Sequence, residues 1–226
     1  MEDKLQNIYY NLGQAGAYTG PAKIHKISQQ QGIKSHGLYK IPKWLQNLDN
    51  YSLQKPVRRN YKRSRISTSS EFEEYDADLA AVTSLSQQND GIQFLLIVID
   101  LFSRYLQVRP LKNKSSKTVL EAFQDIFNNT IKPKKIWTDK GKEFCNNLLE
   151  QYLKTEGIYH HIARNQTKAN YAERCIKTLQ GMLYRYFTKK RTYRYIDVLQ
   201  KFASTYNATP HRSLNYIAPQ DVNDDN

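Results

Sequence analysis

Apolar residues are spaced in two ways along this chain, and the change falls near residue 72. In residues 1–50 they recur every three or four positions in short segments interrupted by Gly and Pro, which predicts a small module of short helices. In residues 72–226 apolar runs of strand length alternate with helical patterns, as in an α/β domain. We therefore expect an N-terminal helical module, a linker over residues 51–71 and a larger α/β domain.

Three strands are expected at the start of the larger domain. They cover Glu74–Leu85, the nearly unbroken apolar run Ile92–Ile99, and Phe102–Leu111. The short connections between them predict an antiparallel meander, and the apolar run predicts a middle strand that is buried on both faces.

Helices and strands alternate over the rest of the domain. Ser115 or Ser116 can cap a helix whose apolar residues repeat with a period of 3.6. Further elements are expected as a strand at 135–138, a helix at 144–156, a strand at 158–163, a helix at 167–188 and a helix at 194–206. This order predicts a five-stranded mixed sheet flanked by helices.

The chain carries a formal net charge of +13, which points to a polyanionic partner such as nucleic acid. Residues 1–70 hold 12 Lys/Arg and three Asp/Glu, so most of the excess lies in the N-terminal third. The short basic helices there are compatible with a helix-turn-helix module. No apolar run approaches the roughly 18 residues of a membrane span, so no membrane partner is expected.

The linker is strongly basic. Its candidate DNA contacts are Arg58, Arg59, Lys62 and Arg63, with Tyr51 and Tyr61 available for stacking. The same run is also typical of a nuclear-import signal, and the two uses are compatible. The protein is therefore expected to be nuclear.

Three acids stand where a metal-dependent phosphodiester chemistry would need them. Asp78 lies in the first strand, Asp139 ends the fourth strand, and Glu173 lies in the first turns of the long helix, with 33 residues between the last two. Hard cations such as Mg²⁺ take carboxylate ligands, and two such ions can activate the nucleophile and stabilise the leaving oxygen. Asp76 shares a face of the strand with Asp78 and is a candidate assisting residue.

The segment from Glu74 to about Val222 resembles the catalytic core of retroviral-type integrases, and is especially similar to the integrases of Maverick/Polinton-type transposons. The residues that carry the resemblance are YDADL around Asp78, LLIVIDLFSRY (95–105), WTDKGKEF (137–144), TKANYAERCIKTLQ (167–180) and YNATPHRS (206–213). The resemblance implies a ribonuclease-H-like fold and 3′-end processing followed by strand transfer. It also implies that Asp78, Asp139 and Glu173 are the metal ligands, and we expect them to hold a pair of Mg²⁺ or Mn²⁺ ions.

The resemblance also implies double-stranded DNA ends and target DNA as partners, with homo-multimers acting on paired ends. Further candidate DNA contacts are Lys168, near the start of the long helix, Lys177 and Arg174 on the same helix, and Lys140. The chain departs from the family where Tyr75-Asp76 replaces Trp-Gln and where Lys140 replaces Asn after the second aspartate.

Two other functions remain open from the sequence. Lys140, together with the lack of the C-terminal module that such integrases often carry, favours an inactive, domesticated DNA-binding protein. A ribonuclease-H-type nuclease acting on RNA–DNA hybrids would share the metal chemistry.

Overall fold

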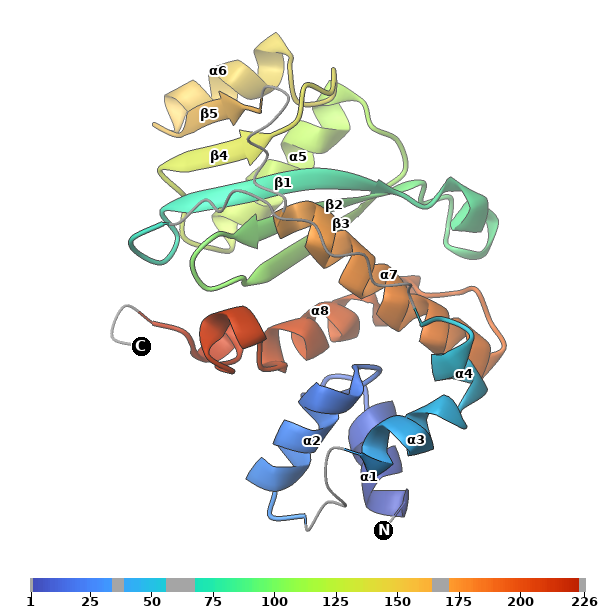
Figure 1. Cartoon of the computed structure of the whole chain (residues 1–226). Coiled ribbons are helices and arrows are strands. Elements are labelled where there is room, and N and C mark those ends of the chain that lie inside the picture. Colours follow the sequence, from blue (N-terminus) through green and yellow to red (C-terminus); the bar gives the residue numbers. More distant parts are fainter. Residues whose placement is uncertain (1, 34–38, 56–67, 164–170, 224–226) are drawn as a thin grey trace. The chain divides into compact units, whose positions relative to one another are not determined.

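A computed structural model of the chain describes residues 2–33, 39–55, 68–163 and 171–223 (Figure 1). The α-helices are α1 (Glu2–Tyr10), α2 (Pro21–Gln30), α3 (Lys40–Gln46), α4 (Asp49–Ser52), α5 (Ser116–Asn128), α6 (Asn147–Thr155), α7 (Tyr171–Lys190) and α8 (Leu199–Ala208). The strands are β1 (Glu74–Ala81), β2 (Phe94–Asp100), β3 (Leu106–Leu111), β4 (Lys135–Thr138) and β5 (Tyr159–Ile162). No helix within the described residues is both long and apolar enough to cross a membrane.

The five strands form one mixed sheet in the order β3-β2-β1-β4-β5 (Figure 1). The first three strands are antiparallel neighbours, whereas β4 runs parallel to β1 and β5 runs parallel to β4. The predicted meander and five-stranded mixed sheet are thereby confirmed. The middle strand β2 is buried along all but its first residue, as the apolar run predicted.

Alternate residues of β1 face opposite sides of the sheet. One side, here called the helix face, packs Tyr75 and Ala77 together with buried residues of α5 and α6 in one apolar core. The other side, here called the carboxylate face, carries Glu74, Asp76 and Asp78. A single strand therefore supplies both a core face and a polar face.

Local signals place the ends of several helices. Ser115, one of the two predicted cap residues, caps α5 by accepting a hydrogen bond from the Thr118 N–H. The next helix begins later than predicted, because the side chain of Asn146 accepts from the Leu149 N–H and starts α6 at residue 147. The chain leaves α6 through Gly157, whose φ of +72° suits a residue without a Cβ atom.

β1 and β3 are each four residues shorter than predicted. β1 ends at Ala81, opposite the first residue of β2, Phe94, so residues beyond it have no partner strand and form a 3₁₀ helix over Thr83–Gln88. β3 begins at Leu106 because the preceding residues form a turn that is held by the carboxylate of Asp100. Strand ends depend on the partner strand, which sequence periodicity does not encode.

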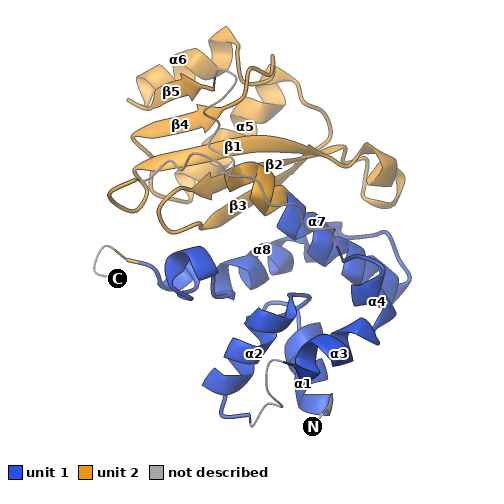
Figure 2. Cartoon of the chain, in the orientation of Figure 1, with its two compact units in different colours: residues 1–60, 177–222 blue, residues 61–176, 223–226 orange. Residues whose placement is uncertain are grey.

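The chain divides into two compact units (Figure 2). One contains residues 1–60 and 177–222, and the other contains residues 61–176 and 223–226. The sheet, α5, α6 and the first six residues of α7 belong to the second unit. The expected boundaries of the linker, near residues 50 and 72, remain a prediction.

The first unit joins the N-terminal helices to the C-terminal ones. The Gly13 N–H donates to Thr205 Oγ1 at 2.8 Å, and Arg185 Nη1 donates to the Tyr18 carbonyl at 2.7 Å. The Tyr18 ring also packs at 6.0 Å from that of Phe202. Buried aromatic rings and backbone-directed hydrogen bonds therefore hold this unit together.

Candidate active site

Asp78 lies in β1, and Asp139 directly follows β4, the strand that pairs in parallel with β1. In this parallel ladder Asp76 is the partner of Trp137. Asp78 lies two residues beyond Asp76, and Asp139 lies two residues beyond Trp137, directly after β4. If the register and the alternation continued past the end of the ladder, both carboxylates would lie on the carboxylate face.

Each of the two aspartates uses one oxygen locally. Asp78 Oδ1 accepts a hydrogen bond from the Leu79 N–H at 2.8 Å, and Asp139 Oδ1 accepts from the Gly141 N–H at 2.9 Å. Both side chains are half-buried. A carboxylate has several acceptor positions, so each aspartate keeps the capacity for a further ligand.

Glu173 lies in the first turn of α7, and Asp76 ties this turn to the sheet. Asp76 Oδ2 accepts hydrogen bonds from the backbone N–H groups of Tyr171 and Ala172 at 2.9 and 2.8 Å. Asp76 is only 6% exposed and lies on the same face of β1 as Asp78. The start of α7, with Glu173, is therefore anchored on the carboxylate face.

The chemistry of the three acids fits a hard divalent cation, because all three supply carboxylate oxygens. Among the described residues, however, no three His, Cys, Asp or Glu side chains lie close enough together to hold a metal ion. Three carboxylates in one place repel each other unless a cation lies between them. The backbone thus brings the strand positions and the helix end to one face, while the side chains stay apart.

The candidate DNA-binding residues are distributed unevenly. Lys140 and Arg174 are exposed in the unit that contains the sheet, and Lys177 is exposed in the other unit. The remaining candidates, Lys168 in the 164–170 segment and the linker residues Arg58, Arg59, Lys62 and Arg63, lie outside the described residues.

Aromatic residues that the sequence analysis did not single out lie on the carboxylate face. Trp137 packs against His161 of β5 with ring centroids 3.9 Å apart, and its Nε1 donates to Glu74 Oε2 at 2.5 Å. Lys135 Nζ lies 4.1 Å from the Trp137 ring centroid. Burial lowers the pKa of His161, and the nearby Lys135 lowers it further. The signal in the sequence was the alternation Lys135-x-Trp137-x-Asp139, which places all three on one face.

A second arrangement surrounds Tyr171. The guanidinium carbon of Arg104 lies 3.9 Å from the Tyr171 ring centroid, and that of Arg174 lies 5.6 Å away. Leu101 and Trp137 pack together near the same ring. Two cations therefore lie near the residue that starts α7, two positions before Glu173.

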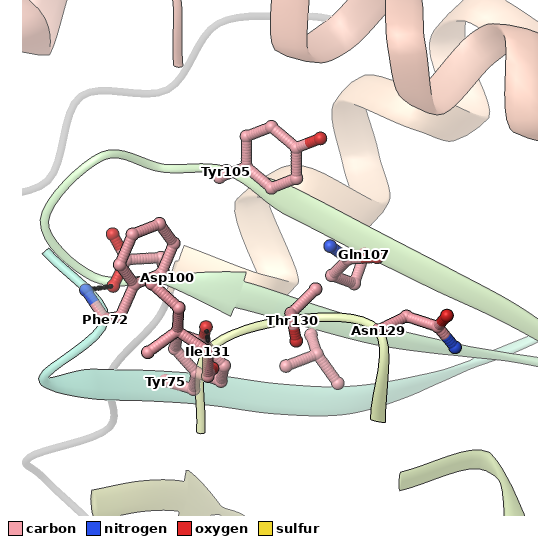
Figure 3. Close-up of a pocket in the computed structure, with 9 residues that line it drawn as sticks. Phe72, Tyr75, Asp100, Tyr105, Gln107, Asn129, Thr130 and Ile131 are labelled. Atoms are coloured by element: carbon pink, nitrogen blue, oxygen red, sulfur yellow. Dashed lines mark hydrogen bonds between the residues drawn. The ribbon is translucent and has the colours of Figure 1, made fainter. Parts of the chain in front are cut away.

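Asp100 holds the turn between β2 and β3. It is 2% exposed, and its carboxylate accepts hydrogen bonds from the Phe72 N–H and from the N–H and hydroxyl of Ser103. Burial raises its pKa. Asp100 also lines a cavity of about 280 Å³ with Tyr75 and residues 129–131, shown in Figure 3. Tyr75 belongs to the helix face, so this cavity is separate from the carboxylate face.

A family model described as the integrase core domain matches residues 81–168. This range contains Asp139, begins three residues after Asp78 and ends before Glu173. It covers less than half of the chain.

Two of the curated relatives are named as products of mobile elements. A transposon-derived protein of Caenorhabditis elegans is 36% identical over 129 residues, which are 57% of this chain and 45% of that protein. The retrovirus-related Pol polyprotein from transposon 412 of Drosophila melanogaster is 31% identical over 137 residues, which are 58% of this chain and 11% of the polyprotein. The chain thus spans less than half of the length of either relative.

Solved structures share the fold. A chain of the simian T-cell lymphotropic virus intasome in complex with the PP2A regulatory subunit B56 gamma matches 83% of this chain and 68% of its own length, with a TM-score of 0.57 and 19% identity. The HTLV-2 integrase catalytic core domain in complex with magnesium matches 67% of this chain and 96% of its own length, with a TM-score of 0.56 and 17% identity. The expected ribonuclease-H-like architecture is thereby confirmed.

Proposed function

We propose that this chain is the catalytic part of a DNA integrase or transposase that processes 3′ ends and transfers them into target DNA. The observation that carries the proposal is the parallel pairing of β1, which holds Asp78, with β4, which Asp139 directly follows, together with the hydrogen bonds of Asp76 that anchor the start of the Glu173 helix. The integrase core match and the mobile-element relatives support the same reaction class. Closeness to Maverick/Polinton integrases is part of the proposal.

In this proposal Asp78, Asp139 and Glu173 hold two divalent ions, Mg²⁺ or Mn²⁺. When bound, such ions make an oxygen nucleophile available at neutral pH and neutralise charge on the phosphate and the leaving oxygen. Neighbouring groups of this chain orient the three carboxylates. The turn at Gly141 holds one oxygen of Asp139, the Leu79 N–H holds one of Asp78, and Asp76 fixes the helix that carries Glu173.

The substrate in this proposal is double-stranded DNA, both at the element ends and at the target. Exposed Lys140 and Arg174 would contact phosphates near the carboxylates. Lys168, Lys177 and the linker arginines and lysines would extend the contact. We place the protein in the nucleus and expect it to act as a homo-multimer, because the two paired ends of the element must both be transferred into the target DNA.

The test offers purified protein a labelled duplex that ends in the element's terminal sequence, with Mg²⁺ or Mn²⁺. Joined products are expected, and each of the variants Asp78→Asn, Asp139→Asn and Glu173→Gln should reduce them to background while DNA binding persists. Asp125→Asn is a matched control, because this exposed carboxylate on α5 pairs with Arg109 away from the site.

Two outcomes would overturn the proposal. Tight DNA binding without any metal-dependent product from the intact chain would indicate a DNA-binding protein without catalysis, consistent with the lysine at position 140. Preferential cutting of the RNA strand of a hybrid would indicate a ribonuclease instead.

A further inference from the structure

A row of side chains leads across the carboxylate face from Asp139 to the sheet edge. Alternation places Trp137 and Lys135 of β4 on this face, Asp139 directly follows the strand, and the register pairs Trp137 with His161 and Lys135 with Tyr159. β5 is the last strand of the sheet, so Tyr159 and His161 lie at its edge.

The rings in this row are graded from buried to exposed. Trp137 is 8% exposed, His161 is half-buried, and Tyr159 is 63% exposed. The Trp137 and His161 rings lie 3.9 Å apart, and the Tyr159 and His161 rings lie 6.5 Å apart with an interplanar angle of 50°. The buried tryptophan and its neighbours thus support an outer pair of rings that solvent reaches.

The charge around the rings is balanced rather than strongly basic. Lys135 lies over the Trp137 ring and pairs with Glu74 at 3.5 Å, and Glu74 also accepts from the Trp137 indole. Contacts to phosphate therefore do not explain this surface well. Exposed rings backed by a fixed aromatic support suit the flat face of a nucleobase, which stacks without regard to sequence.

The distance along the strand also fits a DNA end in the site. Tyr159 lies level with Lys135, four residues before Asp139, which corresponds to about 13 Å along a strand at roughly 3.3 Å per residue. A short unpaired overhang that extends from a phosphate at the carboxylates would run towards this region.

We propose that Tyr159 and His161, supported by Trp137, form a stacking platform for an unpaired base of the DNA end held at the carboxylates. This inference rests on the proposed function and adds that the DNA end has an unpaired base. The DNA end is bound frayed or with an overhang, and its unpaired base lies on the edge strand β5.

The test compares a blunt duplex with the same duplex carrying a short single-stranded overhang that ends in 2-aminopurine. The wild-type chain should quench the 2-aminopurine fluorescence and bind the overhang duplex more tightly than the blunt one. The expected preference is roughly 5- to 150-fold, the equivalent of the roughly 1–3 kcal/mol that stacking one base on an aromatic ring contributes.

Tyr159→Ala should remove most of the quenching and of the preference, while Tyr159→Phe should keep both because the ring remains. The matched control is Tyr193→Ala, since Tyr193 is 60% exposed but belongs to the other compact unit. His161→Ala should give a smaller loss than Tyr159→Ala. Circular dichroism would confirm that each variant is folded.

The outcomes separate this inference from the proposed function. Equal binding of both duplexes by a chain that joins DNA ends would overturn the platform and leave the integrase function standing. An overhang preference that survives Tyr159→Ala would also overturn it. A Tyr159-dependent preference in a chain that joins no ends would support the platform and overturn the enzymatic function, and absence of DNA binding would overturn both.

Discussion

The carboxylate of Asp76 lies 2.8 Å from the backbone nitrogen of Ala172, a residue 96 positions later in the chain. The same oxygen also accepts from the Tyr171 N–H. The first N–H groups of a helix have no partner within the helix, and a carboxylate there also interacts favourably with the helix dipole. Asp76 thereby caps α7 from the sheet and determines where Glu173, one residue beyond Ala172, is held.

Replacing Asp76 by Ala should therefore weaken metal-dependent activity more than it weakens the fold. Loss of a group that orients metal ligands typically costs about 10–100-fold in metal affinity or activity. We expect the Mg²⁺ concentration for half-maximal joining to rise by roughly that factor, with activity recovering at high Mg²⁺. Asp76→Asn keeps an acceptor oxygen and should have an intermediate effect.

The matched control for Asp76 is Ser115→Ala, which removes the cap of α5 away from the carboxylates. This loss should cost about 1 kcal/mol of unfolding free energy. The Mg²⁺ concentration that Ser115→Ala requires for half-maximal joining should stay unchanged. If Ser115→Ala raised the Mg²⁺ requirement as much as Asp76→Ala does, the effect of Asp76 would be one of general stability.

Lys140 directly follows Asp139 and is exposed, so it is positioned to meet a phosphate. Each phosphate contact contributes about 0.9 to the slope of log K against log salt for duplex DNA. Lys140→Gln should reduce the slope by about that amount and weaken binding for all sequences alike. Lys117→Gln, an exposed lysine on α5 paired with Glu121, should leave the slope unchanged. Equal slopes for wild type and Lys140→Gln would exclude the contact.

The Trp137–His161 contact should depend on pH. Because burial and Lys135 lower the pKa of His161, the folded protein favours the neutral ring. The neutral His161 ring contributes fully to the stability of the fold above the ordinary histidine pKa near 6.5, and this contribution is lost as the pH falls through the lowered pKa. The chain has two tryptophans. In Trp44→Phe, the Trp137 fluorescence should therefore change with a midpoint below pH 6.5.

His161→Gln in the same Trp44→Phe background is the control for this titration, and it should abolish the transition. His160, whose pKa is also lowered by burial, bonds to Thr138 at 2.8 Å and should not produce the signal. A midpoint above 6.5, or a transition that persists in His161→Gln, would contradict the assignment.

Gly16 lies close to side chains of both α1 and α2. Its φ is +96°, and a Cβ atom would lie 2.8 Å from Ile8 Cγ2 and 3.0 Å from Ile27 Cδ1. Gly13 has a similar φ of +91° but no atom within 4 Å of the added Cβ. Both substitutions to Ala carry backbone strain, so their difference reports the packing.

We expect Gly16→Ala to lower the free energy of unfolding by about 1–3 kcal/mol more than Gly13→Ala does. Urea unfolding followed by circular dichroism would measure this difference. Equal losses would show that the space around Gly16 accommodates a methyl group.

Much of the fold followed from the sequence because its signals are local. The apolar run predicted a strand buried on both faces, Ser115 predicted the cap of α5, and alternation within β1 put Asp76 and Asp78 on one side. These features depend on residues within a few positions of each other. The spacing of the three candidate acids was also readable directly from the chain.

The tertiary structure decided what lies next to those residues. That Asp76 caps α7, that Trp137 packs on His161, and that β1 ends at Ala81 each depend on a partner distant in the chain. Periodicity gives the face on which a side chain lies but not the strand or helix it meets there. The sequence by itself determined which residues are polar, which are apolar and which are chemically suited to bind a metal. The register of β1, β4 and β5 determined which of these residues share one surface, because only the folded sheet sets which strands are neighbours.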